Sequence, residues 1–116
     1  MGSATVAEGW NGVTWTAQTT PPNNDGPDIT FGSVTCPSET TCFADGAFVN
    51  NLVGGAHETL AESWIGNTWT MLSTPNPAGS GNSYLSGITC GSSTTCTAVG
   101  WSNNGSADLT LVEQYK

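Results

Sequence analysis

The chain has almost no basic residues: Lys116 is the only Lys or Arg among 116 residues, whereas nine residues are acidic and the formal charge is -8. Nucleic acids and anionic membranes are bound through Lys and Arg side chains that neutralise phosphate charge. The composition therefore excludes both as expected partners. A surface rich in Ser, Thr, Asn and Gly needs charge of one sign to stay soluble, so the acidity by itself indicates no ligand.

Long apolar runs and helical periodicity are also missing. No stretch approaches the roughly 18 apolar residues of a membrane span, and no window has the i, i+3, i+4, i+7 spacing of an amphipathic helix. No secretory signal is visible, and residues 1–4 resemble a leader added for expression. Fifteen glycines and six prolines instead separate short runs of alternating apolar character, which predicts an all-β chain.

Residues for catalysis are scarce. The single histidine, His57, lies in a Gly-rich segment that we interpret as an exposed loop. No Ser or Cys has a base near it in the sequence, and no Gly-x-x-x-x-Gly-Lys pattern indicates phosphate binding. The segment Asn23–Asp28 is rich in oxygen ligands but has too few for a calcium loop. We expect no enzymatic activity, no metal and no cofactor.

What the chain does have is an internal repeat. The pattern Ala-Glu-x-Trp-x-Gly-x-x-Trp-Thr begins at Ala7 and again at Ala61, 54 residues later. The same offset relates Thr20-Pro21 to Thr74-Pro75, Cys36 to Cys90 and Cys42 to Cys96. A repeat of this length is a supersecondary unit that cannot bury its apolar faces alone, so copies are expected to stack on one another.

Nine alternating runs predict nine strands. They are Thr5 to Trp10, Thr14 to Thr19, Ile29 to Cys36, Thr41 to Phe48, Thr59 to Trp64, Thr68 to Ser73, Tyr84 to Cys90, Thr95 to Trp101 and Thr110 to Tyr115. Asn11-Gly12 and Ile65-Gly66 suit tight hairpins, because glycine adopts positive φ without steric cost. Four antiparallel strands in a unit of 54 residues have the size of a β-propeller blade, with a β-sandwich as the second architecture.

Several motifs carry a resemblance to a known family. In order along the chain they are Trp-x-Gly-x-x-Trp-Thr, Thr-Pro, Gly-Ile-Thr-Cys (87–90), Thr-Cys-Thr-Ala-Val-Gly (95–100) and Thr-Leu-Val-Glu (110–113). Together they resemble the tandem Cys-containing propeller repeats of bacterial extracellular proteins. They are more distantly similar to Asp-box propeller blades, although both hairpins lack the aspartate of that family. The resemblance implies a propeller fold and no settled activity.

The four strands of a propeller blade are named A to D from the innermost to the outermost. With these names, the nine predicted strands of the chain are, in sequence order, C, D, A, B, C, D, A, B and C. Residues 5–28 then supply strands C and D to a neighbouring blade, residues 29–73 form one full blade, and residues 84–116 form a second blade without its outer strand. Two blades cannot close a ring, so we expect a homo-trimer of six blades, with a homo-tetramer of eight as second choice. Thr5–Trp10 and Thr110–Tyr115 compete for one strand C position, and we predict that Thr110–Tyr115 completes its own blade.

The four cysteines form two Cys-x5-Cys pairs at the tips of predicted hairpins. Antiparallel neighbours there come close enough for disulfides Cys36–Cys42 and Cys90–Cys96. Zinc is the competing interpretation, but its sites favour shorter cysteine spacings and more histidine. Disulfides indicate an oxidising compartment, so we expect a secreted, extracellular protein.

A glutamate lies three times between an apolar and an aromatic residue on one face of strand C. The three sets are Val6, Glu8, Trp10; Leu60, Glu62, Trp64; and Leu111, Glu113, Tyr115. A buried lone carboxylate costs several kcal/mol unless it is hydrogen-bonded, so we expect each glutamate to find a donor on the next blade. A carboxylate beside a stacking Trp is also typical of sugar sites.

Trp101 has no Trp counterpart in the first repeat and precedes the polar turn Ser102-Asn103-Asn104-Gly105, which suits a ligand platform. Two functions follow from these observations. The first is a self-assembling propeller scaffold without catalytic activity. The alternative is a multivalent glycan-binding, lectin-like protein, for which the candidate ligand-binding residues are Glu8, Trp10, Glu62, Trp64, Trp101 and Asn103.

Overall fold

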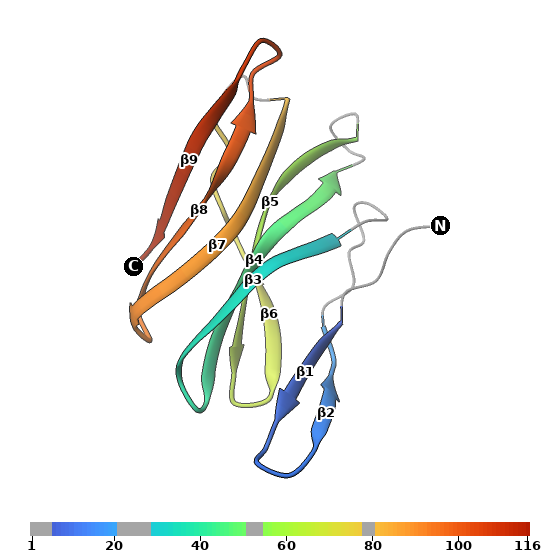
Figure 1. Ribbon diagram of the computed structural model, residues 1–116, viewed down its shortest axis with the longest axis vertical. Helices are drawn as coiled ribbons and strands as arrows, with labels where there is room; N and C mark the ends of the chain where they lie inside the picture. The colour runs from blue at the N-terminus through green and yellow to red at the C-terminus, as the bar shows by residue number, and fades with distance from the viewer. Residues whose placement is uncertain (1–5, 21–28, 51–54, 78–80) are drawn as a thin grey trace.

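The computed structural model describes residues 6–20, 29–50, 55–77 and 81–116. Within them the chain forms nine strands in three antiparallel sheets and no helix, which confirms the all-β expectation (Figure 1). The strands are β1 (Ala7–Trp10), β2 (Trp15–Gln18), β3 (Ile29–Ser38), β4 (Thr41–Asn50), β5 (Ala56–Ile65), β6 (Thr68–Leu72), β7 (Asn82–Ser92), β8 (Thr95–Asn103) and β9 (Asp108–Tyr115). The leader 1–4, the start of the first predicted strand and the segment Asn23–Asp28 lie outside the described residues.

Each sheet is a meander in which sequential strands are neighbours. The sheets are the hairpin β1-β2, the four-stranded sheet β3-β4-β5-β6 and the three-stranded sheet β7-β8-β9. The hairpin turns contain Gly12 and Gly66, with φ angles of 98° and 76°, as the sequence predicts. The side chain of Asn11 accepts hydrogen bonds from the backbone N–H groups of Val13 and Thr14, both at 2.9 Å, and so closes the first turn.

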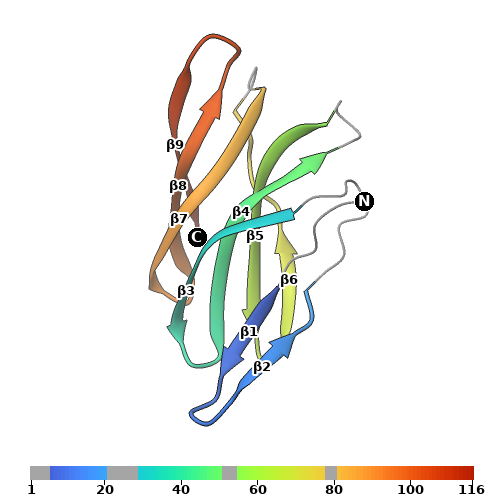
Figure 2. The same cartoon turned by 45° about the vertical axis from the view of Figure 1, so that its right-hand side comes forward.

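The three sheets are layered. The four-stranded sheet lies between the hairpin and the three-stranded sheet, and β7 runs across β3, β4 and β5 (Figures 1 and 2). Between the two larger sheets, Leu85, Ala98 and Leu111 form a buried core with Ile88 packed against it. The ring of Phe43 lies 5.1 Å from that of Tyr115, centroid to centroid, across the same interface. Face-to-face stacking of sheets is common to both architectures that the sequence predicts.

Two glycines at counterpart positions allow the backbone of the preceding strand to pass very close. A Cβ atom on Gly46 would collide with the Thr30 carbonyl oxygen and lie 2.9 Å from the Phe31 Cα. A Cβ atom on Gly100 would collide with the Tyr84 carbonyl oxygen in the same way. A register shift follows in each neighbouring strand, between Phe31 and Ser33 in β3 and between Leu85 and Gly87 in β7. Glycine is therefore a steric requirement at both positions.

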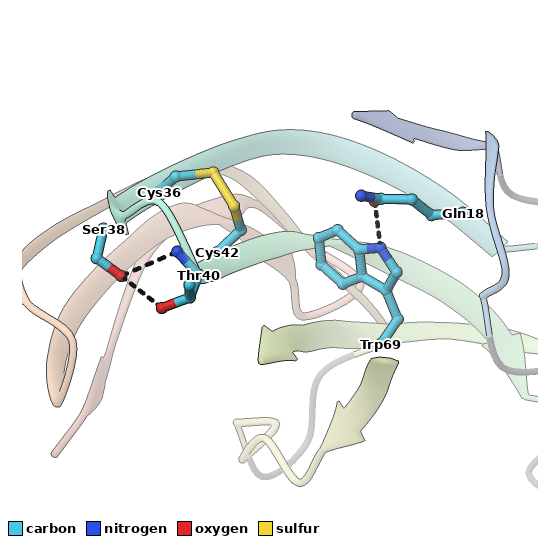
Figure 3. The surroundings of a disulfide bond; sticks show 6 residues. All are labelled: Gln18, Cys36, Ser38, Thr40, Cys42 and Trp69. Carbon is cyan, nitrogen blue, oxygen red and sulfur yellow. Dashed lines mark hydrogen bonds between the residues drawn. A yellow bond between two sulfur atoms is a disulfide. The ribbon is translucent and has the colours of Figure 1, made fainter. Parts of the chain in front are cut away.

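Both predicted disulfides are present. Cys36 bonds to Cys42 and Cys90 to Cys96, with Cα separations of 3.9 and 4.0 Å, and no cysteine is free. In the turn beside the first bond, the Ser38 hydroxyl accepts a hydrogen bond from the backbone N–H of Thr40 at 3.3 Å (Figure 3). Two disulfides are compatible with an extracellular protein.

Candidate functional site

Each sheet has two faces, and we call the face that carries the repeated glutamate the Glu face. Cross-strand partners share a face, so the strand register assigns the other residues. On the Glu face of β7-β9, Glu113 pairs with Ala98. On the Glu face of β3-β6, Glu62 pairs with Ala44. The opposite face of β3-β6 carries Asp45, whose partner on β5 is Ala61.

The opposite face of β3-β6 packs on the Glu face of β7-β9. A cavity of about 70 Å³ remains between them. Its lining includes Ala61, Leu85, Ile88 and Ala98. Asp45 is fully buried beside this interface, where its Oδ1 accepts a hydrogen bond from the Ser33 hydroxyl at 2.9 Å and its Oδ2 has no hydrogen-bond partner. The two larger sheets are thus joined mainly by apolar packing.

The hairpin lies against the Glu face of β3-β6 more loosely than the two larger sheets lie against each other. The cavity between them is about 260 Å³. Its lining includes Ala7, Phe31, Val34 and Ala44, each 54 residues before a residue of the first cavity. The indole N–H of Trp69 donates a hydrogen bond to Gln18 Oε1 at 2.8 Å and ties the two layers together (Figure 3). Part of the first interface therefore recurs at the second, looser one.

The second interface is incomplete, because the hairpin has only two strands. Val34 is 60% exposed, whereas its counterpart Ile88 packs against the core. A groove of about 880 Å³ also opens between the hairpin and β3-β6, with Trp64 and Trp69 in its lining. At the other end of the molecule, the opposite face of β7-β9 exposes Val99, Trp101 and Val112. Both uncovered surfaces are thus largely apolar.

The glutamates at the two interfaces lack the partners that the sequence analysis expects. Glu62 is fully buried, the carboxyl oxygens of Glu113 are buried too, and none of these four oxygens has a hydrogen-bond partner. For Glu62 and Glu113 the expectation of a donor on the neighbouring layer is therefore wrong. Burial raises the pKa of Glu62 and that of Glu113 to about 7. Both side chains accordingly hold a proton more firmly than an exposed glutamate does.

Glu8 and Trp10 lie on the hairpin and, together with Trp64, line the groove between the hairpin and β3-β6. Glu8 is exposed, Trp10 is 55% exposed, and the Trp10 ring lies 5.6 Å from that of Trp15. Their counterparts Glu62 and Trp64 are buried and half-buried. The same sequence motif therefore has different surroundings according to whether another layer covers it.

Trp101 and Asn103 lie on β8. Trp101 is 39% exposed and stacks on Tyr84, with ring centroids 4.3 Å apart. The Asn103 amide donates to Asp108 Oδ1 at 2.7 Å, and its side-chain oxygen accepts from the Gly105 backbone N–H at 2.7 Å, so it closes the β8-β9 turn. The structure thus brings three of the six candidate ligand residues, Glu8, Trp10 and Trp64, to one groove. Glu62 is buried and Trp101 and Asn103 lie on β8, so the six residues do not form one site.

His57 differs from its expected place in a loop. It belongs to β5, where its backbone N–H donates to Asn82 Oδ1 at 2.8 Å and its ring lies 4.8 Å from that of Tyr84. The sequence around it is rich in glycine, which hid the strand, and the contacts that hold it come from β7. The sequence offers Glu58 beside it and no Ser or Cys nucleophile. In the structure, it contacts the Asn82 amide and the Tyr84 ring.

The chain matches no protein-family model, and neither a curated protein nor a solved structure is significantly similar to it. The described residues include no helix long and apolar enough to cross a membrane. Within the same residues, His, Cys, Asp and Glu side chains form no group of three that could hold a metal ion.

Proposed function

We propose that this chain is an extracellular β-propeller module that assembles head to tail with copies of itself. In this assembly the opposite face of β7-β9 in one copy covers the Glu face of β3-β6 in the next. The observation that carries the proposal is the repeated interface, in which Ala7, Phe31, Val34 and Ala44 line one junction and their counterparts 54 residues later line the other. A further junction of the same kind needs no new type of contact.

The exposed residues at the two ends are those that such a junction would bury. Val34 would gain the packing that Ile88 has within the chain. At the other end of the molecule, Val99 pairs with Val112 just as Asp45 pairs with Ala61 in the four-stranded sheet. The sheet β7-β9 covers Asp45 and Ala61 within the chain, and we expect the next copy to cover Val99 and Val112. Contiguous apolar surface of this sort marks an interaction site, and the repeat favours a second copy as the occupant.

Three copies joined in this way would give six blades and four would give eight.

The mass in solution tests this proposal. We expect light scattering to give three times the 11.9 kDa of one chain, with four times as the second result. Val112→Lys places a charge in the junction and should give monomers, whereas Val13→Lys, at the exposed tip of the hairpin, should leave the oligomer intact. A wild-type chain that stays monomeric at high concentration, or a Val112→Lys variant that still assembles, would contradict the proposal.

Glycan binding is the second candidate, because Trp101 presents a partly exposed indole stacked on Tyr84. The proposed junction would cover this ring, so the assembled protein should give no sugar-dependent signal on a glycan array. A hit that disappears in Trp101→Ala while the oligomer mass is unchanged would favour the lectin function instead. Val13→Lys serves as the matched surface control on the same array.

A further inference from the structure

The strand that the repeat calls C occurs three times in the chain, as β1, β5 and β9. In the hairpin Ala7 pairs with Gln18, and in the four-stranded sheet Ala61 pairs with Leu72. Trp10 pairs with Trp15 just as Trp64 pairs with Trp69. The hairpin β1-β2 is therefore equivalent to β5-β6 in both sequence and register. The third copy, β9, pairs with β8 and has no further strand beside it among the described residues.

This duplication creates a conflict in the proposed assembly. The hairpin lies beside the Glu face of β3-β6 in the place that β5 and β6 take on the Glu face of β7-β9, because Ala7 faces Phe31, Val34 and Ala44 across the second cavity as Ala61 faces their counterparts across the first. A second copy that docks its sheet β7-β9 onto the same Glu face brings its own β9 to the position of β1. Both strands cannot occupy that position.

We infer that copies join by strand exchange, in which β9 of one copy replaces β1 of the next copy and pairs with its β2. This inference rests on the proposed head-to-tail assembly. The register follows from the pairs in β5-β6. The expected partners between copies are Val112 with Gln18, Glu113 with Ala17, Gln114 with Thr16 and Tyr115 with Trp15.

The two competing strands differ in how firmly each is held. β9 has eight residues, pairs along its whole length with β8, and buries Leu111 and the carboxyl group of Glu113. β1 has four residues, pairs only with β2, and leaves Val6 and Trp10 exposed. Removing β9 would expose the core between the larger sheets, whereas removing β1 breaks only its four residue pairs with β2. β1 is therefore the strand that leaves.

The exchange also resolves the unpaired edge of the three-stranded sheet. The outer edge of β9 presents backbone N–H and C=O groups that are ready to pair with a strand from another chain. The four ladder pairs that β2 loses with β1 are replaced by four with β9, so hydrogen bonding changes little. The apolar surface covered in the junction then supplies the net gain.

Engineered cysteines distinguish the two pairings of β2. Direct cross-strand partners have Cα separations of about 4.5 to 5.5 Å, which a disulfide can bridge. Val112→Cys combined with Gln18→Cys should therefore give covalent dimers and larger species on a non-reducing gel, with the bond between residues 112 and 18 identified by peptide mass mapping. Ala7→Cys combined with Gln18→Cys is the matched pair for the unexchanged hairpin. In the assembled protein we expect most chains of the first variant, and few of the second, to be linked.

The outcomes distinguish a failure of strand exchange from a failure of the head-to-tail assembly. An oligomer of the expected mass that links residues 7 and 18 within one chain, and not residues 112 and 18 between chains, would overturn strand exchange and leave the assembly standing. A monomer in light scattering, in which residues 7 and 18 link within one chain and residues 112 and 18 give no covalent dimer, would overturn both. Val112→Cys alone should assemble without covalent species, which checks that the substitution itself is tolerated.

Discussion

The free energy of unfolding should fall by about 3 kcal/mol for each of Glu62 and Glu113 as the pH rises from about 4 to 8. Burial raises each pKa from 4.5 to about 7, and one unit corresponds to about 1.4 kcal/mol. The unfolded chain releases these protons near pH 4.5 and the folded chain near 7, so the stability is fully present below 4.5 and lost as the pH rises through 7. Burial also raises the pKa of Asp45, which acts in the same direction.

Desolvation by burial is the cause of both shifts. Asp45 and His57 lie on the face of β3-β6 that packs on the sheet of Glu113. Tyr115 lies on the same strand as Glu113, and the only Lys or Arg in the chain is Lys116. Glu62→Gln keeps the shape and removes the charge. We expect it to match the wild type in chemical denaturation at pH 4 and to exceed it by about 3 kcal/mol at pH 8.

Glu8→Gln is the matched control, because Glu8 has the same place in the repeat but is exposed. Its stability profile should follow that of the wild type at every pH. Two results would show that burial does not raise the pKa of the two glutamates. One is a wild-type unfolding free energy that is constant between pH 4 and 8, and the other is an equal change in stability for Glu8→Gln and Glu62→Gln.

Gly46→Ala should destabilise the fold by more than about 4 kcal/mol, a large share of the 5 to 15 kcal/mol that holds a typical domain together. The new Cβ atom would collide with the carbonyl oxygen of Thr30, and backbone atoms of a paired strand cannot move aside as a flexible side chain can. Gly100→Ala should act alike through the carbonyl oxygen of Tyr84. Urea denaturation followed by circular dichroism measures both effects.

Gly91→Ala provides the comparison for these two variants. Gly91 also lies in a strand, β7, but a Cβ atom there meets no atom within 4 Å. The change in stability should stay within about 0.5 kcal/mol, as for most surface substitutions. If Gly46→Ala unfolds at the same urea concentration as Gly91→Ala, the close approach of β3 to β4 is not the constraint that the geometry indicates.

Much of the fold follows from local sequence signals. Alternating runs place the strands because side chains of a strand alternate between its faces, and Gly12 and Gly66 mark hairpins because the turns require positive φ. The disulfides follow from cysteines that flank a short turn. Each of these features depends on residues that are close together in the chain, so the sequence alone is sufficient to predict them.

Features that depend on the packing of distant strands were not predictable in the same way. The pattern Ala-x-Gly at 44–46 and 98–100 was visible in the repeat, but the backbone that passes over each glycine belongs to another strand. Whether Glu62 meets a donor depends on which side chains the hairpin presents, and these include no donor to its oxygens. The strand position of His57 likewise depends on its contact with Asn82 of β7.

The constant offset between the two interfaces bears on how such a protein can evolve. Residues that line one junction recur 54 positions later in the other, so a crossover between the two halves of the gene would join matching points of the repeat. The product would gain or lose one whole unit, and every strand would keep its register. Selection could then change the number of layers in a single recombination event without rebuilding any contact surface.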